Sequence, residues 1–266
     1  MKRTEIAALM VQRLEPLRDT LRAEFARPGR IRSCVIDELL PPELASEISQ
    51  RFPQPTELTH RATLREDKYV SAQLNQHDPI IEELTFAFQE PPVVSLVSEI
   101  TGLKELFPDA QLYAGGISAM PRGCFLNPHL DNSHDADKKN YRVVNLLYYV
   151  SPNWEESHGG NLELWDDGIA HPPRVVVSRF NRLVLMGTHK SSLHSVNPVR
   201  HEGVRLCVSN YYFSPRSPET EEYFHATSFR GRPEQKATDL LLRADSALRT
   251  AILKVVPYRS FHIYKR

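Results

Sequence analysis

The feature that most constrains the fold is a series of short apolar runs between residues 110 and 213. Each run is rich in Val, Leu, Ile and Tyr, and turn-forming Gly, Pro, Asn and Asp residues separate it from the next run. The eight runs span residues 110–120, 124–127, 142–150, 161–165, 174–177, 182–186, 192–197 and 204–213. Because no helical period interrupts them, we expect β-strands in a sandwich, jelly roll or barrel rather than a parallel α/β sheet.

Helical patterns lie on both sides of this β region. Apolar residues recur every three or four positions over residues 1–30, where Pro16 should kink the helix or start a second one. Helices are also expected at about 41–52, 79–89 and 92–103, whereas residues 53–78 are polar and are expected to be irregular. From about residue 234 an apolar helical stripe returns, which we expect to pack on the sheet or on the N-terminal helices.

These elements predict an α+β chain with a mainly β core and flanking helices at both ends. With 266 residues, the chain is long enough to form one compact domain around its own apolar core. We expect an N-terminal helical region over residues 1–108, the β core over residues 109–215 and a C-terminal helical extension over residues 216–266. If the chain forms oligomers, the terminal helices are the expected contact.

Composition argues against several classes of protein. The 33 Lys and Arg residues balance the 33 Asp and Glu residues, so the simplest case for nucleic-acid binding is absent. No apolar run reaches the roughly 18 residues that a membrane span needs, and no secretory signal is visible. The three widely spaced cysteines argue against a disulfide framework, and we expect a cytoplasmic protein.

The motif Pro128-His129-Leu130-Asp131 carries the first sign of chemistry. In an extended segment, residues two apart point to the same side, so His129 and Asp131 can present an imidazole and a carboxylate to one point. A second histidine, His194, lies on a later predicted strand. Two neutral imidazoles and one carboxylate on one face of a metal leave three octahedral positions open, which is typical of non-haem Fe(II) oxygenases.

Arg205 follows in the next predicted strand, and its planar guanidinium could hold a dicarboxylate by two points. The ordered series of His-x-Asp, His and Arg is more specific than any one of its parts. A zinc hydrolase could use the same histidines and aspartate, but it would have no need of Arg205 behind the metal. His189 is a weaker candidate ligand than His194, because it lies in a polar stretch.

Residues 110–215 resemble the Fe(II)/2-oxoglutarate-dependent dioxygenases, and within them the prolyl 4-hydroxylase-like branch. The segments that carry the likeness are His129–Asn132, Arg142–Val150, Trp154, Gly159–Leu164, Asn181–Leu185, His194–Val199 and Arg205–Phe213. The resemblance implies a double-stranded β-helix, a cupin-like variant of the jelly roll, with flanking helices. It also implies Fe(II), 2-oxoglutarate and O2 as cofactor and cosubstrates, and it allows for ascorbate as a reductant.

The resemblance further implies roles for individual residues. His129, Asp131 and His194 would be the catalytic iron ligands. Arg205 would pair with the distal carboxylate of 2-oxoglutarate, and the family has a tyrosine at the position of Tyr149 that hydrogen-bonds the same group.

Strand alternation in residues 142–150 puts Asn145 and Leu147 on the same face as Tyr149, so these two would also line the cosubstrate site. Tyr148 would then point the other way, into the core. Many relatives carry a tyrosine on the strand before the His-x-Asp motif, but this chain has Ser118-Ala119-Met120 there, and Tyr113 is only a weak substitute.

Asn132, His134 and Arg142 are candidate substrate contacts in the loop that follows the motif. The charges in this loop favour a polar or charged substrate.

The predicted function is a dioxygenase that hydroxylates an unactivated C–H bond of a small molecule or peptidyl residue and releases succinate and CO2. Asp131 argues against halogenation, because the related iron halogenases carry a small residue at that position. Two alternatives stay open. One is a peptidyl-prolyl hydroxylase specifically, and the other is a non-catalytic jelly-roll module that binds a metal or ligand.

Overall fold

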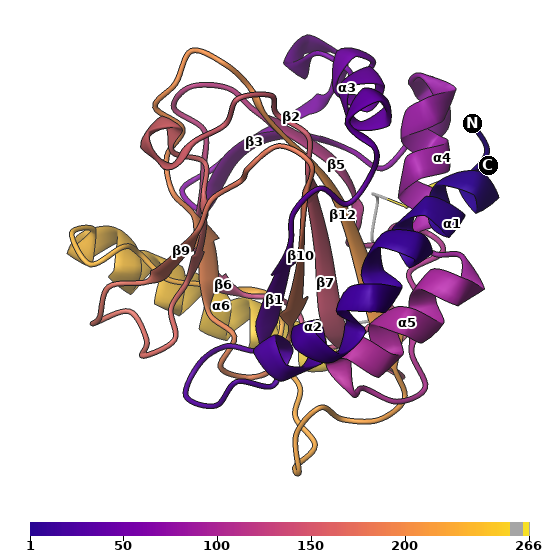
Figure 1. The fold of residues 1–266 in the computed structure, drawn as a ribbon. Coiled ribbons are helices and arrows are strands. Elements are labelled where there is room, and N and C mark those ends of the chain that lie inside the picture. Colours follow the sequence, from indigo (N-terminus) through magenta and orange to yellow (C-terminus); the bar gives the residue numbers. More distant parts are fainter. Residues whose placement is uncertain (256–262, 266) are drawn as a thin grey trace.

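The computed structural model describes residues 1–255 and 263–265, and within these its strands form one curled antiparallel array (Figure 1). Hydrogen-bonded neighbours follow the order β1-β10-β7-β12-β5-β3-β6-β11-β8-β9, with β2, β4 and β13 added at β3, β12 and β6. The strands are β1 (Ser33–Ile36), β2 (Thr59–Ala62), β3 (Glu66–Ser71), β4 (Phe107–Pro108), β5 (Gly116–Met120), β6 (Phe125–Leu130), β7 (Tyr141–Tyr149), β8 (Leu162–Leu164), β9 (Arg174–Val176), β10 (Arg182–Gly187), β11 (His194–Val196), β12 (Arg205–Ser214) and β13 (Ser228–Phe229).

Helices lie mainly before and after this array. The α-helices are α1 (Arg3–Leu14), α2 (Arg18–Phe25), α3 (Pro42–Gln50), α4 (Pro79–Ala87), α5 (Pro91–Thr101) and α6 (Lys236–Val255). A short 3-10 turn that contains Pro16 separates α1 from α2, as the proline predicted. The predicted mainly β, jelly-roll architecture with flanking helices is confirmed. Residues 256–262 and 266 of the predicted C-terminal extension lie outside the described part.

Each of the eight predicted strand segments contains a strand, but residues 53–78 were predicted wrongly. This segment contains the hairpin of β2 and β3, and β3 also pairs with β5 and β6. Charged residues conceal the strand pattern, because the even-numbered side chains of β3 face a polar cavity instead of an apolar core. Tyr69 on the opposite face packs against apolar clusters, but it is the one large apolar residue of that face, so the period of two is hard to recognise.

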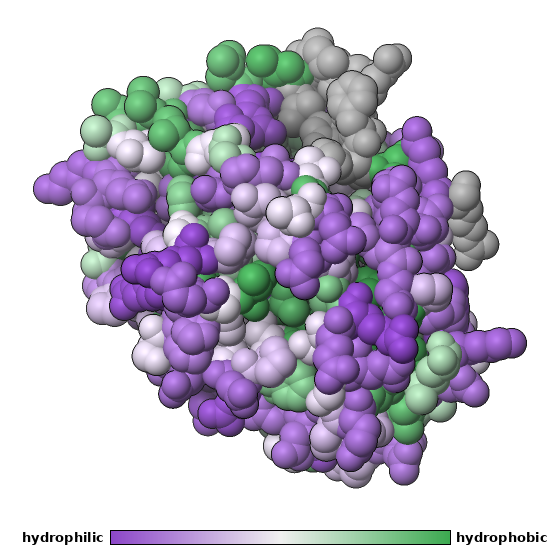
Figure 2. Space-filling view, turned by 90° about the horizontal axis from the view of Figure 1, so that it is seen from above, coloured by the Kyte–Doolittle hydropathy of each residue, from purple (hydrophilic) through white to green (hydrophobic). Residues whose placement is uncertain are grey.

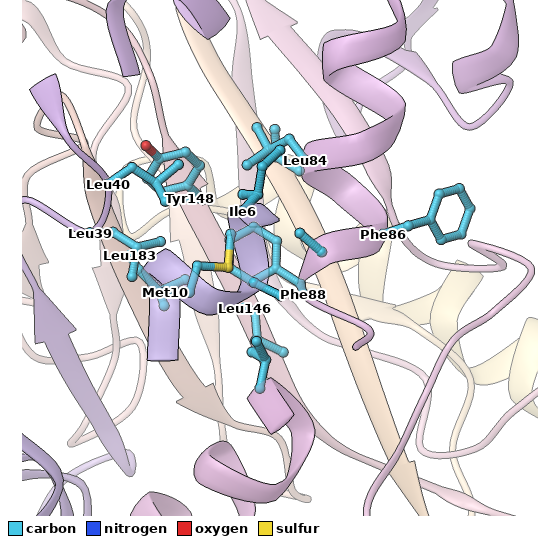
Figure 3. Packing of buried hydrophobic residues seen from close by; sticks show 14 of the residues in the cluster. Ile6, Met10, Leu39, Leu40, Leu84, Phe86, Phe88, Leu146, Tyr148 and Leu183 are labelled. Atoms are coloured by element: carbon cyan, nitrogen blue, oxygen red, sulfur yellow. The ribbon is translucent and has the colours of Figure 1, made fainter. Parts of the chain in front are cut away.

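The main apolar core lies between the N-terminal helices and the outer face of β7 and β10. Ile6 and Met10 of α1 pack there with Leu84 of α4 and with Leu146 and Tyr148 of β7 (Figure 3). Tyr148 is fully buried in this cluster, whereas its neighbours along the strand belong to a second cluster on the inner face. The predicted alternation of β7 is therefore present, and it separates a helix-covered outer face from an inner face that borders the cavity.

Helix α6 packs on β13 of the sheet, as predicted, but through a different face. Only Leu242 and Ser246 of its described side chains are buried, and Ser246 hydrogen-bonds to the backbone of Phe229 in β13. The apolar stripe that we expected to face the sheet is exposed, and Leu240 and Leu248 are 69% and 62% exposed. The register of α6 follows instead from the polar ion pairs of its opposite face, which hydrophobic periodicity does not reveal.

Figure 2 shows the molecule from the top of Figure 1, where α3 and the β2–β3 hairpin lie. Mainly hydrophilic residues cover this face, with apolar residues between them. Across residues 1–255 and 263–265, no helix combines the length and the apolar character that crossing a bilayer requires.

Asn181 joins three parts of the core, and its substitution tests this packing. Its side chain accepts hydrogen bonds from Leu40 N (3.1 Å) and the Tyr148 hydroxyl (2.8 Å), and it donates to Leu40 O (2.7 Å). We expect Asn181→Ala to lower the free energy of unfolding by about 2–4 kcal/mol, because buried polar groups lose their partners and Ala is strained at the φ of 58°. Chemical denaturation measures this loss.

Asn153 provides the matched control, because it has a similar φ of 53° but an exposed side chain. Asn153→Ala should cost about 1 kcal/mol, which isolates the backbone contribution. Equal losses for the two variants would contradict the structural role given to the Asn181 hydrogen bonds.

Candidate metal centre and substrate cavity

Two neighbouring antiparallel strands bring the predicted histidines together. In the pairing of β6 with β11, His129 lies directly opposite His194, and their ring centroids are 4.2 Å apart. Asp131, two residues after His129, points to the same side, and its oxygens lie 3.6 Å from the Nε2 atom of each histidine. One ligand atom from each of the three residues lies within 4.8 Å of the others, which is close enough for one metal ion to bind all three.

Backbone contacts orient both imidazoles for metal binding. The Nδ1 atom of His129 lies 3.0 Å from Asn127 O, and that of His194 lies 2.9 Å from Ser192 O. Because a carbonyl oxygen only accepts hydrogen bonds, each Nδ1 must carry the proton, which leaves the Nε2 lone pair for a metal. A carbonyl contact of this kind is the usual second partner of a metal-ligating histidine.

The charges of the cluster also suit a divalent cation. Burial favours the neutral acid of Asp131, but Arg142 and the two histidines outweigh this effect and hold its pKa well below the usual range. Burial and the neighbouring His129 lower the pKa of His194 to about 4. The expected state at neutral pH is therefore an ionised carboxylate beside a neutral imidazole of His194, the ionisation that a metal requires of such ligands.

Arg142, which we also expected as a substrate contact, lies at the start of β7, within the strand predicted over residues 142–150. Its guanidinium is buried, lies 3.1 Å from Asp131 Oδ2 and stacks 3.6 Å from the centre of the Tyr211 ring. Asn145 donates a second hydrogen bond of 2.8 Å to the same carboxylate oxygen. These two residues hold the carboxylate in place from behind, and both also line the cavity in front of it.

The triad of His129, Asp131 and His194 opens into a cavity of about 350 Å³. Leu147, Leu162 and Val196 give it an apolar wall beside the triad, and Leu147 lies on the predicted face of β7. The opposite wall comes from β3 and β5 and includes Ser118 and Met120, from the segment where relatives carry a tyrosine. Within the described residues, the metal-type cluster contains His194 and not the alternative His189.

Arg205 lies at the inner end of the cavity, beside Tyr149. Its side chain is buried and, among the described residues, donates hydrogen bonds to Ser178 Oγ (3.2 Å) and Met120 Sδ (3.6 Å). None of the described carboxylates forms an ion pair with it. A buried arginine without a counterion calls for an anion, and 2-oxoglutarate would supply a carboxylate.

Tyr149, beside Arg205, also has a polar group that an anion at this end of the cavity could use. Its ring centre is 4.8 Å from the Arg205 guanidinium carbon. Its buried hydroxyl lies beside Ser178 and Arg205, yet it makes no hydrogen bond of good geometry to any residue in the described part. Burial raises the pKa of this hydroxyl, so it stays a donor at neutral pH. Arg205 and Tyr149 thus leave donors that a carboxylate could accept.

A tight turn lets the chain pass close to Arg205. Gly159 and Gly160 have φ values of 70° and 66°, which only glycine adopts without strain. A Cβ atom on Gly160 would lie 3.3 Å from the Arg205 side chain, and one on Gly159 would lie 2.1 Å from Pro198 O. The Gly-Gly sequence is therefore a packing requirement of the cosubstrate site.

The loop after the motif contains the other two predicted substrate contacts. Asn132 lines the main cavity and accepts a hydrogen bond of 3.1 Å from Arg142. His134 lies in the same loop and is only 9% exposed. It packs 4.3 Å from the Tyr141 ring and lines a smaller adjacent cavity of about 50 Å³, to which Asn132 also contributes.

Sequence reasoning missed several residues of the cavity. The Glu66–Lys68 ion pair of β3 (2.8 Å) lines it, as do Phe229 of β13 and Arg249 of α6. Phe229 stacks on His129 with ring centroids 5.1 Å apart. The alternation of residues 66–70 was the available signal for β3, but nothing local marks residues 229 and 249, because folding alone brings them to the motif.

Comparison with known proteins agrees with this geometry. Residues 115–213 match the family model described as the 2OG-Fe(II) oxygenase superfamily. The chain is 29% identical over 143 residues to prolyl 3-hydroxylase OGFOD1 of Mus musculus, a match that covers 47% of this chain and 25% of the mouse protein. The chain therefore spans only about a quarter of that relative.

Solved structures show the same fold. A prolyl hydroxylase from Trichoplax adhaerens, in complex with a hypoxia inducible factor peptide fragment, superposes with a TM-score of 0.55 at 20% identity and covers 76% of this chain and 91% of its own. A prolyl 4-hydroxylase from Phytophthora capsici gives a TM-score of 0.55 at 18% identity, with 93% of this chain and 77% of its own covered.

These findings confirm the resemblance drawn from the sequence. The matched residues contain the His129–Asp131–His194 cluster together with Arg205 and Tyr149. Residues 115–213 are therefore similar to the 2OG-Fe(II) oxygenase superfamily, and the relative and solved structures named above are prolyl hydroxylases.

Proposed function

We propose that this chain is an Fe(II)- and 2-oxoglutarate-dependent dioxygenase that hydroxylates an unactivated C–H bond of a small molecule or a peptidyl residue. The observation that carries the proposal is the pairing of two features in one cavity. The cavity contains a two-histidine, one-carboxylate cluster, and its inner end contains a buried arginine that has no carboxylate partner within residues 1–255 and 263–265. A metal-binding module without turnover would have no need of the second feature.

Iron and 2-oxoglutarate, when bound, supply the oxidising chemistry, in which decarboxylation to succinate and CO2 accompanies transfer of an oxygen atom to the substrate. The chain supplies positions and an environment for that chemistry. His129, Asp131 and His194 would hold the metal by one face, so that its remaining positions open toward the cavity. Arg205 and Tyr149 would bind the far carboxylate of 2-oxoglutarate.

Other residues prepare the site without contacting the reacting atoms. Arg142 and Asn145 keep Asp131 ionised and fixed in one orientation. Leu147 and Leu162 keep water away from one side of the cavity, where a low dielectric strengthens the polar contacts. Asn132 and His134 remain candidate substrate contacts at the side of the smaller cavity.

Peptidyl proline is the more specific candidate substrate. The printed names of the mouse relative and of the two structural neighbours support it. We also propose a cytoplasmic setting without nucleic-acid or membrane partners, with ascorbate as an accessory reductant. The described cysteines, all three buried and unpaired, support a reducing compartment.

The triad assignment is tested by the variant Asp131→Ala. Wild-type protein given Fe(II), 2-oxoglutarate and air should form succinate, and the variant should lose about 100-fold or more of this turnover, because the metal loses its charged ligand. Fe(II) binding, measured anaerobically by calorimetry, should weaken in parallel.

Matched variants separate loss of a ligand from loss of structure. Asp137→Ala and His171→Ala remove the same types of side chain from exposed positions and should keep both turnover and metal affinity. His194→Ala should behave as Asp131→Ala does. Fe(II) binding that is unchanged in both triad variants would refute the assignment.

The cosubstrate assignment is tested at Arg205 and Tyr149. Arg205→Gln should remove about 2–4 kcal/mol of charge-assisted binding, which is roughly a 30- to 700-fold rise in the KM for 2-oxoglutarate. Tyr149→Phe removes one neutral donor and should raise it by roughly 2- to 12-fold. Metal affinity in the absence of 2-oxoglutarate should not change, and a KM unaffected by Arg205→Gln would disprove the assignment.

A further inference from the structure

The cavity has an excess of positive charge. Among the described residues, six cationic side chains and two carboxylates line it, and they are Arg61, Arg65, Lys68, Arg142, Arg205 and Arg249 against Glu66 and Asp131. Three of the cations have carboxylate partners, in the pairs Arg65–Asp245, Lys68–Glu66 and Arg142–Asp131. Arg61, Arg205 and Arg249 have no ion-pair partner in the described part of the chain.

Burial divides these three arginines between the two ends of the cavity. Arg205 is 4% exposed and belongs to the inner end, where the proposed function assigns it to 2-oxoglutarate. Arg61 and Arg249 are half-exposed and therefore lie toward the opening. Because Fe(II) and the 2-oxoglutarate dianion carry equal and opposite charges, binding both leaves the excess at the opening unchanged.

Two separate elements hold Arg61 and Arg249 at this opening. Arg61 of β2 lies directly opposite Lys68 of β3 in the hairpin register, so both side chains lie on the cavity face. Asp245 of α6 forms a close ion pair with Arg65, which follows β2 in the hairpin turn. Arg249 is one helical turn after Asp245 on the same face of α6, and this places it over the cavity.

The arrangement does not serve stability. A half-exposed arginine on α6 could pair with Asp245 four residues earlier, but Asp245 is engaged by Arg65 instead. Arg249 also lines the smaller cavity, together with Thr227 and Asn132, so it lies where the two cavities meet. Both arginines thus keep their guanidinium groups available at the route into the site.

We propose that Arg61 and Arg249 form an anion-recognition site at the opening of the cavity, which selects a substrate that carries a carboxylate or phosphate group. The inference rests on the proposed function and adds a substrate class to it. Two guanidinium groups from separate elements, β2 and α6, could bind the oxygens of such an anion and position the rest of the molecule toward the triad.

Charge-selective labelling of the opening tests this site without any need for turnover. Thr227→Cys puts a thiol beside Arg249, and the native cysteines are buried, so the parent protein gives the background. The rates of reaction with sulfonatoethyl and trimethylammonioethyl methanethiosulfonate, which are anionic and cationic, are compared in protein that contains Zn(II) and saturating 2-oxoglutarate. Because both reagents react with the same thiol, the ratio of the two rates does not depend on the intrinsic reactivity of that thiol.

We expect the anionic reagent to react faster, and Arg61→Gln or Arg249→Gln to lower the rate ratio by roughly 3- to 10-fold each at low salt. Arg27→Gln, at an exposed position away from the cavity, is the matched control and should leave the ratio unchanged. A ratio that neither cavity variant changes would overturn the proposal.

Protection of the same thiol identifies the group that binds. N-Acetylglycine, methyl phosphate and the neutral N-acetylglycinamide are added separately before labelling. The proposal is supported if an anion protects the thiol, the amide does not, and this protection is lost in Arg249→Gln. The anion that protects more strongly tells whether the site prefers a carboxylate or a phosphate. Equal protection by the amide, or protection by none of the three, overturns it. The succinate assay reports on the proposed function independently of this result.

Discussion

The pairing of β6 with β11 is the constraint on which the whole site depends. It places His129 opposite His194, and the two-residue period of an extended chain then brings Asp131 to the same point. A slip of one residue in this register would turn His129 away from the cavity and destroy the cluster. The neighbouring strands β8 and β13 pair with β11 and β6 on either side and hold this register.

The second requirement is a polar interior beside apolar cores. Strand β7 borders both the apolar core and the polar interior. Its outward residues pack under the N-terminal helices, whereas Asn145 and Leu147 face the cavity. Buried charges in that cavity are stable only in pairs, and the Arg142–Asp131 and Lys68–Glu66 pairs meet this condition. Arg205 has no carboxylate partner in the described part of the chain, and this is the strongest physical argument for the proposal that an anion binds at the inner end.

Much of the β core could be predicted, because its strands alternate against apolar surroundings and turn residues separate them. The His129–Asp131–His194 cluster could also be predicted, since the order of His-x-Asp and the later His along the chain is distinctive, whereas the roles of Arg205 and Tyr149 stay predictions. Strand β3 was missed because one face of it is charged and lines the cavity. The contribution of α6 was misjudged because Asp239 and Asp245, rather than its leucines, attach it to the core. Long-range polar contacts of this kind leave no periodic signal.

If one cavity holds a metal at the triad and 2-oxoglutarate between that metal and Arg205, the two should strengthen each other's binding. Calorimetric titration of 2-oxoglutarate under anaerobic conditions, with and without Fe(II), measures this coupling. We expect Fe(II) to strengthen 2-oxoglutarate binding, and 2-oxoglutarate to strengthen Fe(II) binding by the same factor. Equally tight binding of 2-oxoglutarate without the metal would show that the two do not share the cavity in this way.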